Sequence, residues 1–310
     1  MSDPDPLVSV VILCWNSENK VDKTLNSVLS IDNIDLEVII VDNNSSDRTT
    51  DICKQILTKS DCRYNIVKNK TNIGYSAGKN LGGNLATGKY ILLLDDDVIV
   101  DGDVLTKLVH NYNKEPKSGL LTPKTYDRET NQYLGGCFTK FGTTTNYSKN
   151  KLETSCEMVE APFVTGATLF TSKKFWDELG GFDEFAKFNL DDFDISIRSY
   201  SRGQKNYIIS TTEAIHIGDM SENLARRYRS YYYSRQYIFC KNLPTLRLFK
   251  VSVLFFLSSL YFSMRDSVSE GDIWILINHI VSILSFIHKL PHILEKRKAT
   301  DHISEFPIFQ

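Results

Sequence analysis

Several features that would define a broad class are missing from this 310-residue sequence. The 36 basic and 38 acidic side chains leave a net charge of -2, so composition gives no global argument for nucleic-acid binding. The six cysteines form no C-x-x-C pair, and we interpret them as reduced thiols that serve as small apolar side chains. The opening residues MSDPDPLVSV lack the basic start and long apolar run of a secretory signal. Together these absences predict a cytoplasmic, reducing location.

The composition that is present is ordinary for a globular protein, with 42% hydrophobic and 24% charged residues. Three short, apolar, β-rich runs bounded by polar turns are typical of strands buried on both faces of a parallel sheet. These runs are 8–14, 37–41 and 90–94. Segments with a helical spacing of apolar residues lie at 20–29, 47–57 and 80–86. The alternation predicts an α/β fold in which helices flank a mostly parallel sheet.

The second half of the sequence is less regular. Region 119–158 is rich in Thr, Asn, Gly and Lys with little periodicity, which predicts irregular strands and loops. Helices are predicted over 175–179, ending at Gly180 and Gly181, and over 191–202. Strands are predicted over 207–210 and 213–216.

A change of character follows residue 224. Residues 224–250 contain seven basic side chains, no acidic one and seven aromatics. Two apolar runs, 251–264 and 273–287, come next. At 14 and 15 residues they are shorter than the roughly 20 apolar residues that a membrane-spanning helix needs. A pair of interfacial or core-packing helices is therefore favoured over two spans.

The segment YILLLDDDV, from Tyr90 to Val98, places three carboxylates directly after a buried strand. Ligands of open α/β sheets bind at the carboxyl ends of strands. Alternation along an extended chain puts Asp95 and Asp97 on one side and Asp96 on the other. Packed carboxylates repel unless a cation is present, and hard oxygen ligands suit Mg²⁺ or Mn²⁺ carrying a diphosphate. The alternative is a solvated acidic turn.

Two further segments favour nucleotide binding. Asp42 also ends a buried strand, where an acid can accept hydrogen bonds from a ribose hydroxyl or a base edge. The segment NIGYSAGKNLGG, from Asn72 to Gly83, is neither GxGxxG nor a Walker loop. It predicts a tight loop that enters a helix, where free N–H groups can face phosphate and Lys79 can add a charge. A flexible turn is the alternative.

Acids at a predicted helix start supply a candidate base. Asp191 and Asp192 begin LDDFDISIR, and carboxylates are favoured there by the helix dipole alone. The functional alternative is a general base that deprotonates an acceptor hydroxyl. A lone histidine, His216, follows a strand; it is structural unless it reaches the carboxylates, where it would complete a metal shell.

Taken in order, these segments resemble the GT-A glycosyltransferases of family 2, over roughly residues 7–221. Three segments resemble the family's first strand, its nucleotide-contacting loop and its D-x-D metal motif. In that order they are VILCWNSE with Asn16, VDNNSSD with Asp42, and LLLDDD with Asp95 and Asp97. NIGYSAGKNLG resembles its NxGfaxxxNxG, which matches Asn72, Gly74 and Asn80. VTGATLF, which contains Gly166 and Ala167, resembles the family segment that lies between donor and acceptor. His216 falls where the family often has a histidine that contacts the metal or the diphosphate. LGGFDE and LDDFDISIR resemble GGFDe and the E-D-x-D catalytic helix.

The sequence departs from the family pattern at three places. Asp191-Asp192 replaces the usual Glu-Asp; by position Asp192 matches the base, with Asp191 second. Asp96 has no role carried over and is taken only as a donor neighbour. The Gln-x-x-Arg-Trp motif of processive polymer synthases is absent, which favours single addition. A narrower resemblance points to rhamnosyltransferase-like enzymes of surface-polysaccharide assembly.

The resemblance implies an inverting, metal-dependent hexosyl- or deoxyhexosyltransferase. Its partners would be a nucleotide-diphosphate sugar and a glycan or polyprenyl-diphosphate-linked acceptor, with Mg²⁺ or Mn²⁺ as cofactor and no nucleic acid. A catalytic domain is expected over 1–223, with a nucleotide-binding half at about 1–100 and an acceptor half at about 101–223. A helical region is expected over 224–310.

Two questions stay open from the sequence. The basic, aromatic stretch suits anionic headgroups or a lipid-diphosphate acceptor, which predicts peripheral membrane contact through 224–290; a packed helical domain with a solvated basic face is the alternative. The other function classes are a nucleotidyltransferase acting on sugar phosphates and a non-catalytic nucleotide-sugar binding protein. A nucleotidyltransferase would carry a Gly-rich triphosphate loop after 8–14, which the sequence lacks, and a non-catalytic protein would lack the base or the metal acids.

Overall fold

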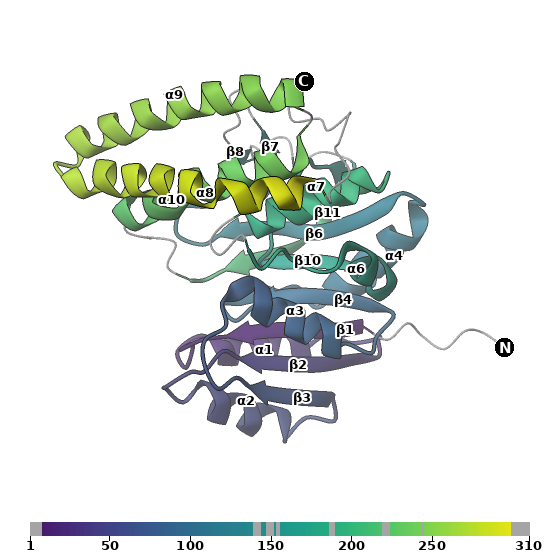
Figure 1. Ribbon diagram of the computed structural model, residues 1–310. Helices are drawn as coiled ribbons and strands as arrows, with labels where there is room; N and C mark the ends of the chain where they lie inside the picture. The colour runs from purple at the N-terminus through teal and green to yellow at the C-terminus, as the bar shows by residue number, and fades with distance from the viewer. Residues whose placement is uncertain are drawn as a thin grey trace.

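The computed structural model describes residues 8–138, 144–146, 152, 156–185, 190–218, 224–243 and 245–298. Strands and helices alternate through the first hundred residues and give way to three long helices at the end (Figure 1). The strands are β1 (Val8–Cys14), β2 (Leu36–Asp42), β3 (Arg63–Lys68), β4 (Tyr90–Asp95), β5 (Val98–Val100), β6 (Ser118–Asp127), β7 (Gly136–Phe138), β8 (Thr144–Asn146), β9 (Met158–Glu160), β10 (Thr168–Ser172) and β11 (Lys205–His216). The helices are α1 (Val21–Leu29), α2 (Thr49–Leu57), α3 (Tyr75–Leu85), α4 (Val104–Lys114), α6 (Lys173–Leu179), α7 (Asp191–Ser201), α8 (Leu224–Asn242), α9 (Thr245–Ser269) and α10 (Ile273–Lys298).

A mixed sheet forms the centre, in the order β3-β2-β1-β4-β10-β6-β11-β5, with β9 also on β11. The first four strands are parallel to one another, and β10 is antiparallel to both of its neighbours. The predicted mostly parallel sheet flanked by helices is therefore confirmed. β7 and β8 form a separate two-stranded sheet.

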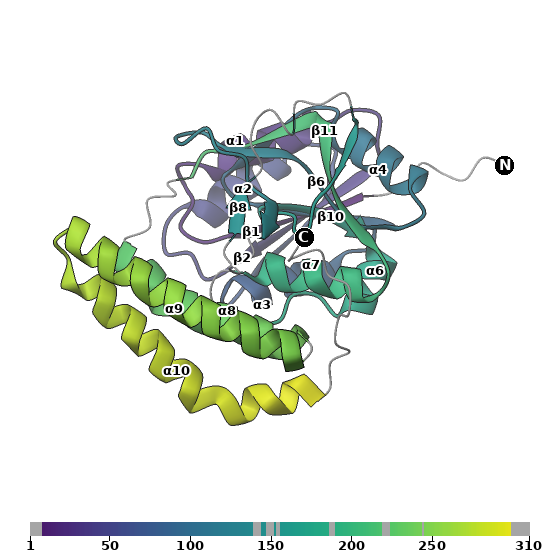
Figure 2. The ribbon, with the colours of Figure 1, turned by 90° about the horizontal axis from the view of Figure 1, so that it is seen from above.

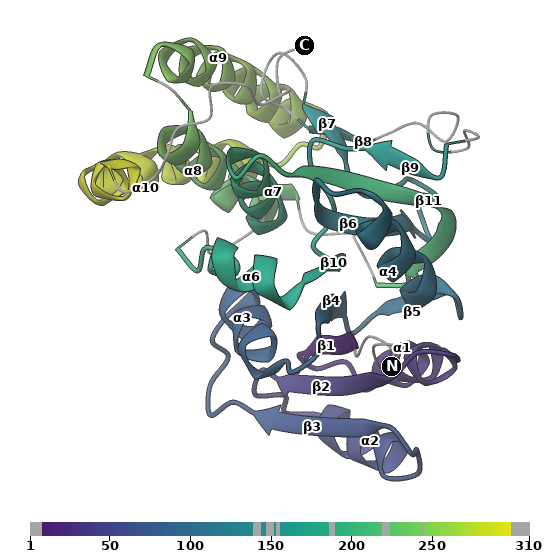
Figure 3. The same cartoon turned by 90° about the vertical axis from the view of Figure 1, so that its right-hand side faces the viewer.

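Alternation along each buried strand builds two cores. Val10 and Ile12 point to the face covered by α1, α2 and α4, whereas Val11 and Leu13 point to the face covered by α3 and α6. Figure 3 shows these helices on the two sides of the sheet. Helix α3 lies very close to β1, because a Cβ on Gly82 would fall 2.2 Å from a Val11 methyl group. Gly78 and Gly82 therefore serve helix–strand packing, since a Cβ on Gly78 would likewise meet the Leu13 side chain of β1.

The region predicted to be irregular contains a central strand. β6 is ten residues long, and most of its side chains are buried. Its Thr122 and Thr125 hydroxyls lie 2.7 Å and 2.6 Å from the Thr168 hydroxyl of β10. These threonines satisfy one another inside the sheet, which explains how a polar-looking sequence forms a buried strand. Parts of 119–158 lie outside the described residues.

The last three helices share a core with the sheet-containing part of the chain. Side chains of α8, α9 and α10 form one apolar cluster with Phe193 and Ile197 of α7. In Figure 2 α9 and α10 run along the outside of the molecule, with α7 between them and the sheet. The described part of the basic, aromatic stretch is mostly interior: Arg235, Tyr237 and Phe239 are at most 1% exposed. Most described side chains of α8 are therefore packed inside the protein, away from any lipid surface.

Candidate active site

The carboxyl ends of β1, β2 and β4 meet at one edge of the sheet. β1 lies between the other two, with Cys14 opposite Asp42 and Leu13 opposite Asp95. The side chains that the sequence singled out after β2 and β4 therefore gather around the loop that leaves β1. Crevices of this kind are the usual ligand sites of open α/β sheets.

Asp42 organises the loop after β2. Its buried carboxylate accepts hydrogen bonds from the Ser45 backbone N–H at 2.8 Å and from the Thr50 hydroxyl, and pairs with Lys68 at 3.2 Å. Burial raises its pKa, but the bonds from Ser45 and Thr50 outweigh burial and hold the pKa below the usual value. Asn16, whose φ is +51°, joins this loop to the β1 loop through a 2.9 Å bond from the Ser46 N–H.

Three predicted donor residues have partners inside the protein. Asn72 accepts hydrogen bonds from the Asn43 side chain and from the Gly74 N–H, both at 2.9 Å. Lys79 is fully buried; its amine donates to the Leu94 carbonyl at 2.6 Å and pairs with Asp95 at 2.8 Å. The expectation that Lys79 offers its charge to a phosphate is thus corrected, because the amine is used to hold Asp95.

Asn80 departs from the sequence expectation in the same way. Its side chain makes three hydrogen bonds, to Phe182 N, Phe182 O and Glu184 Oε1, at 2.8, 3.0 and 2.9 Å. It therefore fastens the segment before α7 to α3 and does not face a donor.

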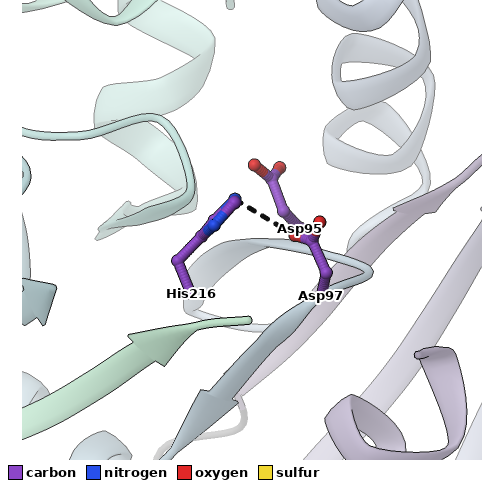
Figure 4. Close-up of side chains that lie close together, drawn as sticks. All are labelled: Asp95, Asp97 and His216. Carbon is purple, nitrogen blue, oxygen red and sulfur yellow. Dashed lines mark ion pairs between the residues drawn. The ribbon is translucent and has the colours of Figure 1, made fainter. Parts of the chain in front are cut away.

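Asp95, Asp97 and His216 form the candidate metal centre (Figure 4). One ligand atom from each lies within 4.8 Å of the others, and His216 Nε2 is 3.3 Å from Asp97 Oδ1. β11 brings the histidine there, because His216 pairs with Val98, the residue after Asp97. His216 reaches the carboxylates and so meets the condition that the sequence set for a role in a metal shell.

The donor set fits a divalent cation. Two carboxylates and one imidazole are ligands that Mg²⁺ and Mn²⁺ accept. Among the described residues, His216 Nδ1 and Asp127 Oδ2 are buried without a hydrogen-bond partner, 3.8 Å apart. A carboxylate behind a ligating histidine is the usual outer support of a metal site. Asp127 was not anticipated from the sequence, because nothing in region 119–158 indicated a strand that ends beside His216.

Asp96 has a structural role that the sequence left open. Its carboxylate accepts the Trp15 N–H at 3.0 Å, and its carbonyl accepts the Thr24 hydroxyl at 3.0 Å. Burial and the neighbouring charge of Asp97 raise its pKa to about 6. Asp96 therefore ties the acidic turn to the loop after β1.

The two acids at the start of α7 lie near the candidate metal centre, because Gly166 and Tyr75 connect Asp192 to Asp95. Asp192 accepts hydrogen bonds from the Gly166 N–H at 3.3 Å and the Phe193 N–H at 2.7 Å. Asp191 is buried and accepts the Ser76 hydroxyl at 3.2 Å, whereas Asp192 is partly exposed. Burial raises the pKa of both acids; the charge of Asp192 raises that of Asp191 further, and the charge of Asp95 adds to that of Asp192.

Tyr75 joins the two halves of the site, a role that no sequence motif indicated. Its hydroxyl lies 2.9 Å from Asp95 Oδ1 and 3.0 Å from the Gly166 carbonyl. A Cβ on Gly166 would lie 3.3 Å from both Asp192 Cβ and the Tyr75 hydroxyl, so a glycine permits this close approach. Ala167 is buried beside it, and its carbonyl accepts the Asp95 N–H at 3.0 Å.

Comparisons with known proteins agree with this site. Residues 9–180 match the model of glycosyl transferase family 2. Poly-beta-1,6-N-acetyl-D-glucosamine synthase of Staphylococcus epidermidis is 30% identical over 128 residues, which are 41% of this chain and 31% of that protein. An uncharacterized glycosyltransferase of Haemophilus influenzae is 33% identical over 104 residues, 34% of this chain and 32% of that one. The matches thus span about a third of the length of these relatives.

Two solved structures share the fold along nearly the whole chain. S. aureus TarS in complex with UDP-GlcNAc superposes with a TM-score of 0.62 at 16% identity, covering 94% of this chain and 87% of that one. Mannosyltransferase PcManGT of Pyrobaculum calidifontis, in complex with GDP-Man and Mn²⁺, superposes with a TM-score of 0.60 at 16% sequence identity. The match covers 95% of this chain and 80% of that one. The family model matches more than half of this chain. The chain therefore belongs to glycosyltransferase family 2 and has the GT-A fold.

Proposed function

We propose that this family 2 glycosyltransferase moves a hexosyl or deoxyhexosyl group from a nucleotide-diphosphate sugar to a hydroxyl of a glycan or lipid-linked acceptor, with inversion. One observation carries the proposal. Asp192 is bonded to Gly166, whose carbonyl accepts from Tyr75, which also contacts Asp95. A candidate base and a candidate diphosphate site are therefore held together through one glycine and one tyrosine.

The donor end contains the acids and cations that a diphosphate requires. Asp95, Asp97 and His216 would hold a Mg²⁺ or Mn²⁺ ion, which when bound neutralises charge on the leaving diphosphate. The amine of Lys20 lies 3.2 Å from Asp97 and is 39% exposed, so it adds positive charge beside the same group. Asn16, Asn72 and Gly74 shape the surrounding loops.

At the acceptor end, Asp192 removes the proton from the attacking hydroxyl as the new glycosidic bond forms. The N–H groups of Gly166 and Phe193 hold its carboxylate in place, and partial exposure lets an acceptor reach it. Asp191 is buried behind it and positions the start of α7. Attack from the face opposite the leaving diphosphate inverts the anomeric carbon.

The proposal also specifies the class of donor sugar and the number of sugars that are added to each acceptor. Similar proteins and structures are named for N-acetyl-D-glucosamine, UDP-GlcNAc and GDP-Man, which supports a hexose-type donor. The absence of Gln-x-x-Arg-Trp supports single addition.

A nucleotide-sugar panel tests the proposal directly. Donor hydrolysis and transfer would be measured with UDP-GlcNAc, GDP-mannose and dTDP-rhamnose, with Mg²⁺, Mn²⁺ or a chelator. We expect turnover of one donor class, lost with the chelator. Asp192→Asn should retain donor binding but lose about 10²–10⁴-fold in transfer, the contribution usual for a general base.

Asp177→Asn is the matched control, because this exposed carboxylate of α6 pairs only with its neighbour Lys173 among the described contacts. It should transfer at the parental rate. Near-parental transfer by Asp192→Asn would contradict the base assignment, and release of pyrophosphate from a nucleoside triphosphate would show a nucleotidyltransferase instead.

A further inference from the structure

The outer faces of α9 and α10 expose an unusual amount of apolar surface. Among the described residues, nine large apolar side chains on α9 and α10 are at least half exposed: Phe249, Leu257, Tyr261, Met264, Val268, Ile273, Trp274, Leu284 and Ile287. Values reach 83% for Val268 and 74% for Phe249. Monomeric soluble proteins seldom leave so large a contiguous apolar patch in water. We call these residues the hairpin face.

The interior of the same hairpin is more polar than its outside. Along α9 the buried positions recur every four residues, at Val251, Phe255, Ser259, Ser263 and Ser267. On α10 the buried positions include His279 and Ser282. Ser259 and Ser263 satisfy their hydroxyls within their own helix, through carbonyls three residues earlier. A helix pair folded for water has the opposite arrangement, with polar side chains outside and apolar ones inside.

The hairpin is placed to meet a flat surface. Figure 3 shows α9 and α10 at the edge of the molecule, with α8 and α7 between them and the sheet. In Figure 1 the parallel strands run toward the left, where the α9–α10 turn also lies. The hairpin turn and the edge of the sheet that contains the site thus lie on the same side.

Length distinguishes lying on a bilayer from crossing it. Leu248–Ser269 and Ile273–Arg297 have the length and apolar composition of membrane-crossing helices. Their stretches without Asp, Glu, Lys or Arg are shorter, 251–264 and 273–288. At 1.5 Å per residue these cover about 21–24 Å, less than the ~30 Å hydrocarbon core. Helix α8, with its buried Arg235 and Gln236, also packs along α10 and would have to enter the bilayer with it.

We propose that the hairpin face inserts into one leaflet of a lipid bilayer, with α9 and α10 lying in the plane of the membrane. Lys250 lies at the end of the hairpin where α9 begins; its side chain is exposed and complements anionic headgroups. Tyr261 and Trp274 belong to the residue types that favour the membrane interface. The inserted surface is thus supplied by α9 and α10, and not by the basic, aromatic α8.

Vesicle flotation tests this assignment with the full chain. We expect binding to phosphatidylcholine vesicles that strengthens when phosphatidylglycerol is added. A double variant, Leu257→Glu with Leu284→Glu, should bind at least about tenfold more weakly, because it places charge in the inserted face. Both positions are exposed, so the circular-dichroism spectrum and thermal midpoint should stay at parental values.

Tyr64→Glu is the control, since Tyr64 is 43% exposed on β3, far from the hairpin. Equal binding of the double variant and the parent would overturn the proposal, as would a parent that fails to bind vesicles. A concentration-dependent dimer that the double variant abolishes, without vesicle binding, would assign the face to a second copy of the chain and also overturn it.

Depth-dependent quenching separates insertion from crossing. In a Trp274→Phe background, Leu284→Trp places an indole near the middle of the uncharged stretch of α10. Phospholipids brominated close to the headgroup should quench it more than phospholipids brominated near the chain ends. Stronger quenching by the deep bromines would show that the hairpin crosses the bilayer and would overturn the in-plane arrangement.

Discussion

Asp191 and Asp192 are adjacent in the chain but have different surroundings. Asp191 is enclosed with Ser76, and Asp192 faces the crevice under the Gly166 N–H. Burial raises the pKa of both, so each holds its proton to a higher pH than an ordinary aspartate. A raised pKa makes Asp192 a stronger base once it is ionised.

The pH profile of transfer should report this shift. Because the base must be ionised, activity is present above the raised pKa of Asp192 and is lost as the pH falls through it. We therefore expect the acid limb of kcat/KM to lie above the value of about 3.9 typical of an unperturbed aspartate. The test is to transfer aliquots of the protein to buffers of different pH and to measure kcat/KM in each. Thermal stability measured in the same buffers shows where the protein stays folded. An acid limb at the ordinary carboxyl value in a chain that stays folded would contradict the assignment.

Residue types and strand ends were enough to indicate the metal centre. Asp95 and Asp97 could be placed because a buried strand stopped at them, and His216 because it followed another strand. The internal partners of Lys79 and Asn80 could not be predicted, since a motif fixes where a side chain begins and not what encloses it. The role of Tyr75 could not be predicted either, because it depends on a contact with Gly166, which is 91 positions away in the sequence.

At the scale of elements, α8 is fastened to the start of the catalytic helix by charge. Lys241 donates to Asp183, just before α7, at 2.7 Å and to both oxygens of Asp194, within α7, at 2.9 and 3.0 Å. Tyr237 donates to the same Asp183 at 2.5 Å. Burial would raise the pKa of Asp183, but the charge of Lys241 and these hydrogen bonds hold it well below its usual value.

Replacing Lys241 should loosen this fastening. Lys241→Met removes the cation that the two acids share but leaves Asp183 paired with Lys296 at 3.3 Å and Asp194 paired with Arg198 at 2.8 Å. The cost should therefore stay below the roughly 3–5 kcal/mol typical of a buried charge left wholly unpaired. We expect a lower free energy of unfolding in denaturant at pH 7, together with reduced kcat because α7 carries the base. The deficit should shrink as the pH falls through the depressed pKa of Asp183, since stability from a depressed carboxyl pKa is lost there.

Lys205→Met provides the comparison, because Lys205 pairs with Glu160 at 2.7 Å with both side chains more than 40% exposed. Exposed pairs contribute about 0–1 kcal/mol, so this variant should unfold close to the parent. Equal losses from the two substitutions would contradict a special role for Lys241.

The elements themselves were predictable to different degrees. β1, β2 and β4 were identified by uninterrupted apolar runs. β6 was missed because its buried threonines satisfy one another only after β10 is placed beside them. α9 and α10 are longer than their apolar runs, at 25 and 26 residues, because their polar ends pack against α8 and the Asp183 segment.

At the scale of the whole molecule, the C-terminal helices complete the core of the catalytic half. Phe163, Phe193 and Ile197 are buried in the cluster that α8, α9 and α10 supply. The expected boundary near residue 223 therefore separates a helical region from a sheet in sequence, while the apolar core is continuous across it.

A chain ending at residue 223 should consequently be unstable. It would expose Phe193 and Ile197, which are 0% and 1% exposed in the full chain, and would strip Lys241 from its two acids. We expect loss of cooperative thermal unfolding and aggregation at concentrations where the parent is monodisperse, measured by calorimetry and light scattering. A truncated chain that unfolds cooperatively at the parental temperature would show that the helices are dispensable for the core.

The shared core also sets an order of events during synthesis. The strands and loops that surround the metal centre are complete once β11 has emerged from the ribosome, but α7 still lacks one side of its packing. Only when α8 has been made can Lys241 reach Asp183 and Asp194, close to the proposed base Asp192. We therefore expect a nascent chain to form the strands of the proposed donor site before α7, which carries the proposed base, has its full packing.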